Sequence, residues 1–228
     1  CKFIITHTFK KVDHHNIFGI TENKIRKNHL LFSASICDTV AIGPVINLLE
    51  KKINIKDGNI ITLHPWLGYQ NLLDGVSRSF AYPGKIVENF ALGRSSPTNL
   101  IPKSTSCINA LNFVMPGINK KITAMSIRVP TAIVSAAILN LSFKKKISKV
   151  EIKKILKDFE KKQKYQILSL NDDQLVSGDL IKSKYSSIID MRWLKIYENQ
   201  CRILIWYDNE YGYTRRVIDL INKINEQE

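Results

Sequence analysis

Residues 201–213 read C-R-I-L-I-W-Y-D-N-E-Y-G-Y, an apolar run followed by a polar turn. β-Branched and aromatic residues dominate the run as far as Tyr207, which favours an extended chain packed within a sheet. Two further runs of this kind, Ile122–Val129 and Ala132–Phe143, predict more strands of one sizeable sheet. Beyond the turn, apolar residues recur at helical spacing over about Tyr213–Asn225, which predicts an amphipathic helix that needs a partner surface.

The other expected elements do not alternate regularly between strand and helix. Ser148 and Glu151 form a capping-box sequence that opens a second amphipathic helix. A third helix is expected over Cys37–Lys51, where Pro44 should kink it or weaken its first turns. Short strands are expected over Lys2–Thr6, Leu30–Ser35 and Asn59–His64, and Asp57-Gly58 should bound the last of them. A loop-rich stretch is expected from Gly75 through Pro83 to about Pro102. We therefore expect an α+β protein with a large, mainly antiparallel mixed sheet and helices packed on one face.

Length and composition indicate a folded protein with enough apolar residues for a large core. The 228 residues are 44% hydrophobic and 24% charged, and no apolar run reaches the roughly 18 residues that a membrane helix needs. We therefore expect a soluble protein with no membrane partner. The net charge of +14 comes largely from lysines, which make up 26 of the 34 basic residues and are scattered along the chain. Because base readout usually recruits clustered arginine, we expect no nucleic-acid partner.

The four cysteines, Cys1, Cys37, Cys107 and Cys201, lie far apart in the sequence with no C-x-x-C pair. This spacing fits neither a zinc framework nor a small disulfide scaffold, so we expect no metal site and reduced thiols in a cytoplasmic protein. The chain contains no G-x-G-x-x-G turn and no Walker loop, so any nucleotide site has to be completed by residues outside it. Because the chain begins with Cys1 rather than methionine, we expect a fragment of a longer protein.

Cys37 and His64 are the candidate reactive residues. Cys37 stands between an expected strand and the first turn of a helix, where backbone N–H groups and the helix dipole favour a thiolate. His64 ends an expected strand, from which its imidazole can face a nucleophile at a neighbouring helix start. A cysteine with a histidine is found in thiol hydrolases and in aldehyde-oxidising enzymes. A buried inert cysteine and a structural histidine remain open alternatives at this point.

Four segments, in this order, resemble the catalytic domain of the glyceraldehyde-3-phosphate dehydrogenase superfamily. They are S-A-S-I-C-D-T with the proline at 44 (33–44), T-L-H with a downstream D-G (62–75), R-V-P-T (128–131) and W-Y-D-N-E-Y-G-Y (206–213). The opening F-G-I-T-E-N-K-I-R-K-N-H is similar to the erythrose-4-phosphate dehydrogenase branch. The resemblance implies a dinucleotide-binding Rossmann domain that precedes this chain. It assigns residues 1–36 to the last strands of that domain, 37–210 to the catalytic domain and 211–228 to a C-terminal helix packing back on the cofactor domain.

The resemblance also implies roles for individual residues. Cys37 matches the nucleophile that forms a thiohemiacetal and then a thioester, and His64 matches the base that accepts the protons. Asn209 matches the residue that hydrogen-bonds the nicotinamide carboxamide, and Tyr213 matches the aromatic packing behind the ring. The implied cofactor is NAD or NADP, bound only partly by this chain.

The phosphate sites are implied by other positions, several of which depart from the family pattern. Arg128 and Thr105 match residues that suit phosphate oxygens, and Arg94 falls on a long loop that lines the cofactor and a subunit interface. Three kinds of family residue are replaced in this chain. Ile36 stands where the family usually has serine, and Ser106 stands where it has glycine. Threonines of the family pattern are replaced by Asp38, Leu67 and Tyr69. An ionised Asp38 would repel phosphate. Together these departures predict an altered substrate site, which Asp38 and Ser106 help to line, with water rather than phosphate resolving the thioester.

The leading hypothesis is the catalytic half of an NAD(P)-dependent dehydrogenase that oxidises a small phosphorylated sugar aldehyde in carbohydrate metabolism, assembled as a homotetramer. The second is a catalytically inactive assembly protein of the same family, which the substitutions around Cys37 favour. The third is a cysteine hydrolase that uses Cys37 and His64 without a cofactor. The third hypothesis leaves the segment 206–213 without a role.

Overall fold

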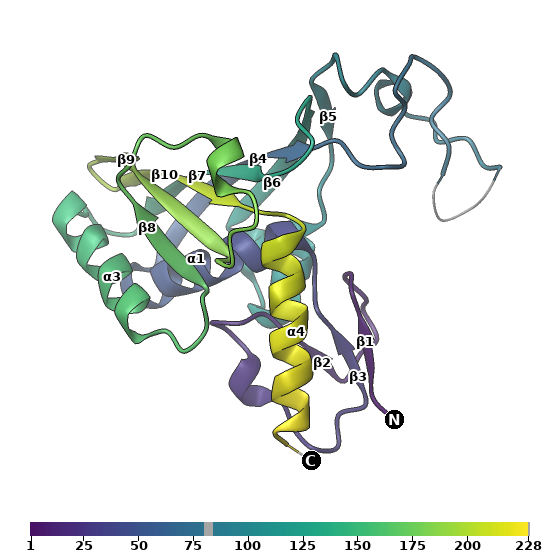
Figure 1. Ribbon diagram of the computed structural model, residues 1–228. Coiled ribbons are helices and arrows are strands. Elements are labelled where there is room, and N and C mark those ends of the chain that lie inside the picture. Colours follow the sequence, from purple (N-terminus) through teal and green to yellow (C-terminus); the bar gives the residue numbers. More distant parts are fainter. Residues whose placement is uncertain (80–83, 228) are drawn as a thin grey trace.

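The computed structural model describes residues 1–79 and 84–227, and its largest feature is a seven-stranded mixed sheet (Figure 1). The strands lie in the order β5-β6-β4-β7-β10-β9-β8. Their bounds are β4 (Ile55–Pro65), β5 (Ile101–Lys103), β6 (Ile122–Val129), β7 (Ser135–Phe143), β8 (Leu168–Asn171), β9 (Ser187–Tyr197) and β10 (Gln200–Tyr207). Only β4 with β6 and β8 with β9 pair in parallel among these described neighbours. The predicted α+β class with a mainly antiparallel sheet is confirmed.

Helices α1 (Cys37–Ile53), α2 (Cys107–Val114) and α3 (Lys149–Lys162) pack on one face of this sheet. α1 runs without interruption through Pro44 and lies under the middle strands (Figure 1). Its buried residues, such as Val45 and Ile46, join the inward residues of β7 and β10, such as Leu139 and Ile203, in the main core. Burying an aliphatic side chain of this size is worth about 1.5–3 kcal/mol, so this layer supplies much of the stability.

The core position of Leu49, fully buried in α1, leads to a stability prediction. Leu49→Ala should lower the free energy of unfolding by about 2.7–5 kcal/mol, because it removes packed atoms and leaves a cavity. Urea denaturation followed by circular dichroism measures the change. Leu73→Ala is the matched control, because Leu73 is 81% exposed and its truncation should stay within about 0.5 kcal/mol. Equal losses in the two variants would contradict this core.

The predicted start of α3 is confirmed by its N-cap. Ser148 Oγ accepts a hydrogen bond from the Glu151 backbone N–H at 3.1 Å. The Glu151 carboxylate instead pairs with Lys145 at 2.9 Å. Ile152 and Leu156 then face the core, which explains the apolar stripe of this lysine-rich helix.

The N-terminal segment forms a small parallel sheet that packs beside the C-terminal helix. β1 (Phe3–Ile5) and β2 (His14–His15) both pair with β3 (Leu31–Ser33). Helix α4 (Tyr211–Asn225) packs Leu220 and Ile224 into a second hydrophobic cluster with this segment (Figure 1). The division into units 1–36, 37–210 and 211–228 stays a prediction.

Asp57 and Gly58 lie inside β4, so the prediction that they bound this strand was wrong. The register shifts between Ile55 and Asp57, which marks a bulge against β7. A Cβ on Gly58 would lie 2.7 Å from the Asn140 carbonyl oxygen. Glycine is therefore needed here because the neighbouring backbone approaches closely, and not because the chain turns.

Other boundaries also differ from the prediction. β7 begins at Ser135 rather than Ala132, because Val134 has a φ of 68° and cannot continue an extended strand. The sequence pattern predicted no regular element at β2, β5, α2, β8 or β9. Four short 3₁₀ helices complete the described structure, at Glu22–Lys24, Phe90–Gly93, Ile118–Lys120 and Ser177–Leu180.

The predicted loop-rich stretch projects from the sheet between β4 and β5 (Figure 1). The Gly75 N–H donates to the Gly93 carbonyl at 2.9 Å, and a Cβ on Gly93 would lie 2.2 Å from the Gly75 oxygen. The lack of a side chain at Gly93 therefore lets two parts of the loop meet. Residues 80–83, with Pro83, lie outside the described residues. Within the described part of the chain, no helix has the length and apolarity needed to span a membrane.

Candidate active site

Cys37 is the first residue of α1 and is half-buried at the inner face of the sheet. Ser35 has a φ of 63°, so the chain turns sharply just before Ile36 returns to an extended conformation. This turn follows β3 and places the sulfur at the N-terminal end of a 17-residue helix.

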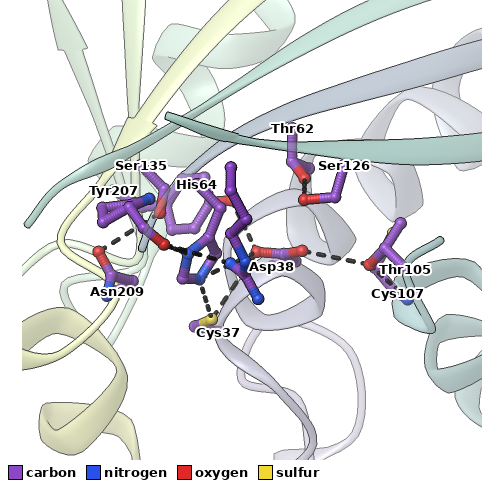
Figure 2. A network of polar contacts seen from close by, with 12 residues as sticks. Cys37, Asp38, Thr62, His64, Thr105, Cys107, Ser126, Ser135, Tyr207 and Asn209 are labelled. Carbon is purple, nitrogen blue, oxygen red and sulfur yellow. Dashed lines mark hydrogen bonds and ion pairs between the residues drawn. The ribbon is translucent and has the colours of Figure 1, made fainter. Parts of the chain in front are cut away.

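His64 projects from the end of β4 toward Cys37 (Figure 2). Its Nε2 lies 3.5 Å from the Cys37 sulfur. Its Nδ1 lies 2.8 Å from the Pro65 carbonyl oxygen, which can only accept a hydrogen bond. Nδ1 therefore carries the hydrogen in the neutral ring, and Nε2 presents its lone pair to the thiol. The structure brings the two candidate reactive residues together.

Asp38 is buried beside the same sulfur and is held from two sides. Tyr207 donates its hydroxyl to Asp38 Oδ1 at 2.8 Å, and Thr105 donates to Oδ2 at 3.3 Å. The Cys37 sulfur lies 3.7 Å from Oδ1. Asp38 and Thr105, both predicted to line the substrate site, therefore bond to each other (Figure 2). No role was predicted for Tyr207 from the sequence, although Tyr207 lies within the segment 206–213 that carries the family resemblance.

Burial and charge both act against a thiolate at Cys37. Burial raises the pKa of the Cys37 thiol well above its ordinary value, and the Asp38 carboxylate raises this pKa further by repelling the thiolate. Burial also lowers the pKa of His64, although the Asp38 charge opposes this shift. Both shifts favour a neutral thiol and a neutral imidazole in the resting pair. The Asp38 backbone N–H at the helix start lowers the pKa of Cys37, as expected, but desolvation and the Asp38 carboxylate outweigh this effect.

Arg128 lies next to His64 across the β4–β6 pairing and is buried. Its two terminal nitrogens donate over long distances, both 3.4 Å, to the Pro65 carbonyl and the Tyr69 hydroxyl. Its Nε is buried and has no hydrogen-bond partner among the described residues. A buried guanidinium with an unused donor favours an anionic ligand at this position.

The remaining predicted site residues lie at different distances from this centre. Asn209 is buried two residues after β10 ends, where its Oδ1 accepts from Ser135 Oγ and its Nδ2 donates to Glu210, each at 3.3 Å. The Tyr213 hydroxyl donates to the Ser35 carbonyl at 3.1 Å, and burial raises its pKa. Ser106 is exposed before α2 and makes no capping hydrogen bond. Arg94 is exposed in the projecting loop, where it pairs with Asp74 at 2.9 Å.

Comparisons with known proteins identify the family of this chain. Residues 36–209 match the family model described as "Glyceraldehyde 3-phosphate dehydrogenase, C-terminal domain". The chain belongs to the glyceraldehyde-3-phosphate dehydrogenase family. The match begins at the residue before the cysteine of this site and ends at the buried asparagine.

Curated relatives support the same family. "Glyceraldehyde-3-phosphate dehydrogenase 1" of Trichoderma koningii is 31% identical over 213 residues, which are 93% of this chain and 60% of the relative. "Glyceraldehyde-3-phosphate dehydrogenase" of Schistosoma mansoni is 32% identical over 211 residues. "Glyceraldehyde-3-phosphate dehydrogenase, cytosolic" of Sinapis alba is 32% identical over 206 residues. These matches cover 92% and 90% of this chain, and 60% and 58% of the relatives. The chain thus spans about 60% of the length of these members of the glyceraldehyde-3-phosphate dehydrogenase family.

The donor set beside Cys37 fits the nicotinamide end of the cofactor that the family implies. The Asn209 amide can both donate to and accept from a carboxamide. Ser35, whose carbonyl binds Tyr213, also has a buried hydroxyl without a partner among the described residues. A polar ligand group in this region would satisfy that hydroxyl.

The carboxylate beside the thiol leads to a second prediction. Asp38→Asn should speed iodoacetamide alkylation of Cys37 about 3- to 10-fold at pH 7 in metal-free buffer. Removing the negative charge lowers the pKa of Cys37 and so raises the fraction of thiolate. A less basic thiolate is also a weaker nucleophile, which cancels part of the increase in rate. Mass spectrometry of the labelled chain measures the rate. Asp74→Asn, which changes an exposed aspartate in the loop, should leave the rate unchanged. An equal rate in the Asp38 variant would contradict this electrostatic effect.

Proposed function

We propose that this chain is the catalytic part of an NAD(P)-dependent dehydrogenase that oxidises a phosphorylated sugar aldehyde. The observation that carries the proposal is the 3.5 Å contact between Cys37 and the lone pair on His64 Nε2, beside the buried guanidinium of Arg128. The family and its cytosolic relatives support a place in glycolysis and in the cytoplasm.

The proposed chemistry begins with the sulfur of Cys37. Its S–H bond breaks as the sulfur attacks the aldehyde carbon, and His64 Nε2 accepts the proton and passes it to the carbonyl oxygen. The product is a thiohemiacetal on Cys37. In the next step His64 Nε2 takes the hydroxyl proton, the carbon–oxygen bond regains double-bond character, and a thioester remains. The Pro65 carbonyl keeps the imidazole in the orientation that both proton transfers need.

The dinucleotide, when bound, supplies the acceptor for the hydride that leaves the thiohemiacetal carbon. Asn209 would orient its carboxamide and Tyr213 would pack behind its ring, as the family resemblance implies. Residues outside this chain would hold the pyrophosphate and would decide between NAD and NADP.

Water as the final acyl acceptor is supported by Asp38. Its carboxylate lies 3.7 Å from the sulfur, where it would repel an incoming phosphate. Water attack on the thioester carbon would release the acid and return the proton to the Cys37 sulfur.

The test of the function is NADH or NADPH formation by the full-length protein with a series of sugar-phosphate aldehydes, with and without inorganic phosphate. Turnover that does not depend on phosphate is the expected result. An acyl phosphate product would overturn water as the acceptor but would retain the dehydrogenase. No reduced cofactor with any aldehyde, together with a Cys37 that iodoacetamide does not label, would overturn the function.

Arg128 leads to a prediction about the substrate. Arg128→Lys should raise the KM for a phosphorylated aldehyde roughly 10- to 100-fold, because lysine keeps the charge but loses the fork that binds two phosphate oxygens. Steady-state kinetics of the full-length protein measures the change. An unphosphorylated aldehyde of equal length is the control, and its KM should change little. A similar KM increase for both aldehydes would argue against phosphate binding at Arg128.

The second candidate function is an inactive assembly protein, favoured by the raised pKa of the Cys37 thiol beside Asp38. We propose a homotetramer in either case. Self-association is supported by the outer face of the sheet, where Trp193 and Tyr197 are exposed and where Ile138 and Leu204 line an apolar hollow with Trp193. A tetramer by light scattering with no Cys37 labelling and no turnover would favour the assembly protein over the enzyme.

A further inference from the structure

Three metal-binding side chains converge at the N-terminal end of α1. Cys37, Asp38 and His64 each offer one ligand atom, and these atoms lie within 4.8 Å of one another. The sulfur lies 3.5 Å from His64 Nε2 and 3.7 Å from Asp38 Oδ1, and Nε2 lies 4.0 Å from Oδ1. The sequence showed no metal motif because two ligands are adjacent and the third follows 27 residues later on another element.

We propose that these three residues form a binding site for a zinc ion. The inference goes beyond the proposed dehydrogenase and does not require it. In zinc sites the sulfur, nitrogen and oxygen ligands lie about 2.0–2.3 Å from the metal, so neighbouring ligand atoms of a tetrahedron are roughly 3.3–3.6 Å apart. The three distances here approach those edges, and the longest has to shorten by about half an ångström. A fourth position stays open to water or a ligand.

Hydrogen bonds from neighbouring residues already orient two of the ligands. His64 donates Nδ1–H to the Pro65 carbonyl, which directs Nε2 toward the sulfur. The hydroxyls of Tyr207 and Thr105 donate hydrogen bonds to the Asp38 carboxylate and fix it beside Cys37. Hydrogen bonds that hold the ligands from behind are typical of metal sites, because they set the imidazole tautomer and the ligand geometry.

The charges at the site balance when zinc binds. The Cys37 S–H bond breaks, the proton goes to water and a zinc–sulfur bond forms. The thiolate and the Asp38 carboxylate then offset the two positive charges of the ion. Arg128, Lys103 and the positive end of α1 oppose a cation here, so they weaken the binding that the two anionic ligands provide. The mixed sulfur, nitrogen and oxygen set favours zinc over magnesium or calcium, which prefer oxygen ligands.

Bound zinc would occupy both atoms on which the proposed chemistry depends. The Cys37 sulfur would no longer attack an electrophile, and His64 Nε2 would no longer accept a proton. Zinc and an alkylating reagent therefore compete for the same sulfur, and the site acts as an inhibitory metal site.

The experiment measures metal binding directly, with neither aldehyde nor dinucleotide present. The whole chain carries Cys1→Ser, which removes an exposed thiol. Titration with Co²⁺ should give one equivalent of binding with a sulfur-to-cobalt charge-transfer band. Zn²⁺ should displace the cobalt and slow iodoacetamide labelling of Cys37 at least tenfold.

Substitutions assign the ligands. Cys37→Ser should abolish the charge-transfer band, and Asp38→Asn should weaken zinc binding at least tenfold in competition with a chromophoric chelator. Tyr207→Phe, which removes only the hydroxyl that holds Asp38, should weaken it by a smaller factor. Asp74→Asn is the matched control and should bind zinc like the parent. Circular dichroism checks the fold of each variant.

A charge-transfer band that persists in Cys37→Ser, or unchanged labelling of Cys37 in saturating zinc, would overturn the site. If Cys37→Ser does not fold, the labelling experiment on the parent decides the matter. Failure of the dehydrogenase assay leaves these outcomes unaffected, because the binding measurement uses no substrate.

Discussion

Full-length protein that carries Cys37→Ser is expected to form no reduced dinucleotide above background, a loss of at least about 1,000-fold in kcat. The serine hydroxyl fits the space of the thiol, but its oxygen is a far weaker nucleophile toward an aldehyde. Loss of the nucleophile also removes the thioester, so no acyl-enzyme should appear in mass spectra of the protein mixed with substrate. Absorbance of the reduced cofactor measures the rate.

The control for this variant is Cys1→Ser, which changes an exposed thiol distant in the sequence and should keep parental turnover. Alkylation gives a second comparison, because iodoacetamide should inactivate the parent in proportion to labelling at Cys37. If Cys37→Ser retains a tenth of the parental rate, the covalent mechanism is wrong and the site acts by another route.

The pairing of Cys37 with His64 could be anticipated from sequence because each residue ends or begins an element. A cysteine at a helix start and a histidine at a strand end both lie at the same edge of the sheet once β4 and α1 pack. The interaction of Asp38 with Tyr207 could not be anticipated in this way. The two residues are 169 positions apart and meet only because β10 lies beside β7 and delivers Tyr207 to the inner face.

The protonation state of Cys37 depends on more than its position at a helix start. The helix end stabilises a thiolate by a fixed and modest amount. The desolvation of the sulfur depends on how closely the sheet covers it. The repulsion that the Asp38 carboxylate exerts on a thiolate depends on the rotamer that Tyr207 and Thr105 hold. Both effects arise from tertiary packing, which a local pattern does not report.

The missed strand β9 has a local cause. Its sequence S-I-I-D-M-R-W-L-K-I-Y alternates only in part, because the pairing with β10 shifts register between Arg202 and Leu204. Ile189 and Met191 face the core before the bulge, and Leu194 and Ile196 face it after the bulge. The change from odd to even core-facing positions breaks the period of two on which strand prediction rests.

His64→Asn in the full-length protein is expected to lower kcat about 10²- to 10⁴-fold, because the neutral thiol of Cys37 then has no base at 3.5 Å to take its proton. Asparagine keeps a polar side chain of similar reach but has no basic lone pair, so KM should change far less than kcat. Added imidazole should restore part of the rate, which a purely structural histidine would not allow. His14→Asn, at a buried histidine of the small N-terminal sheet, is the matched control and should retain turnover. A fall in KM and kcat together without imidazole rescue would instead assign His64 a packing role and leave the proton transfer to another group.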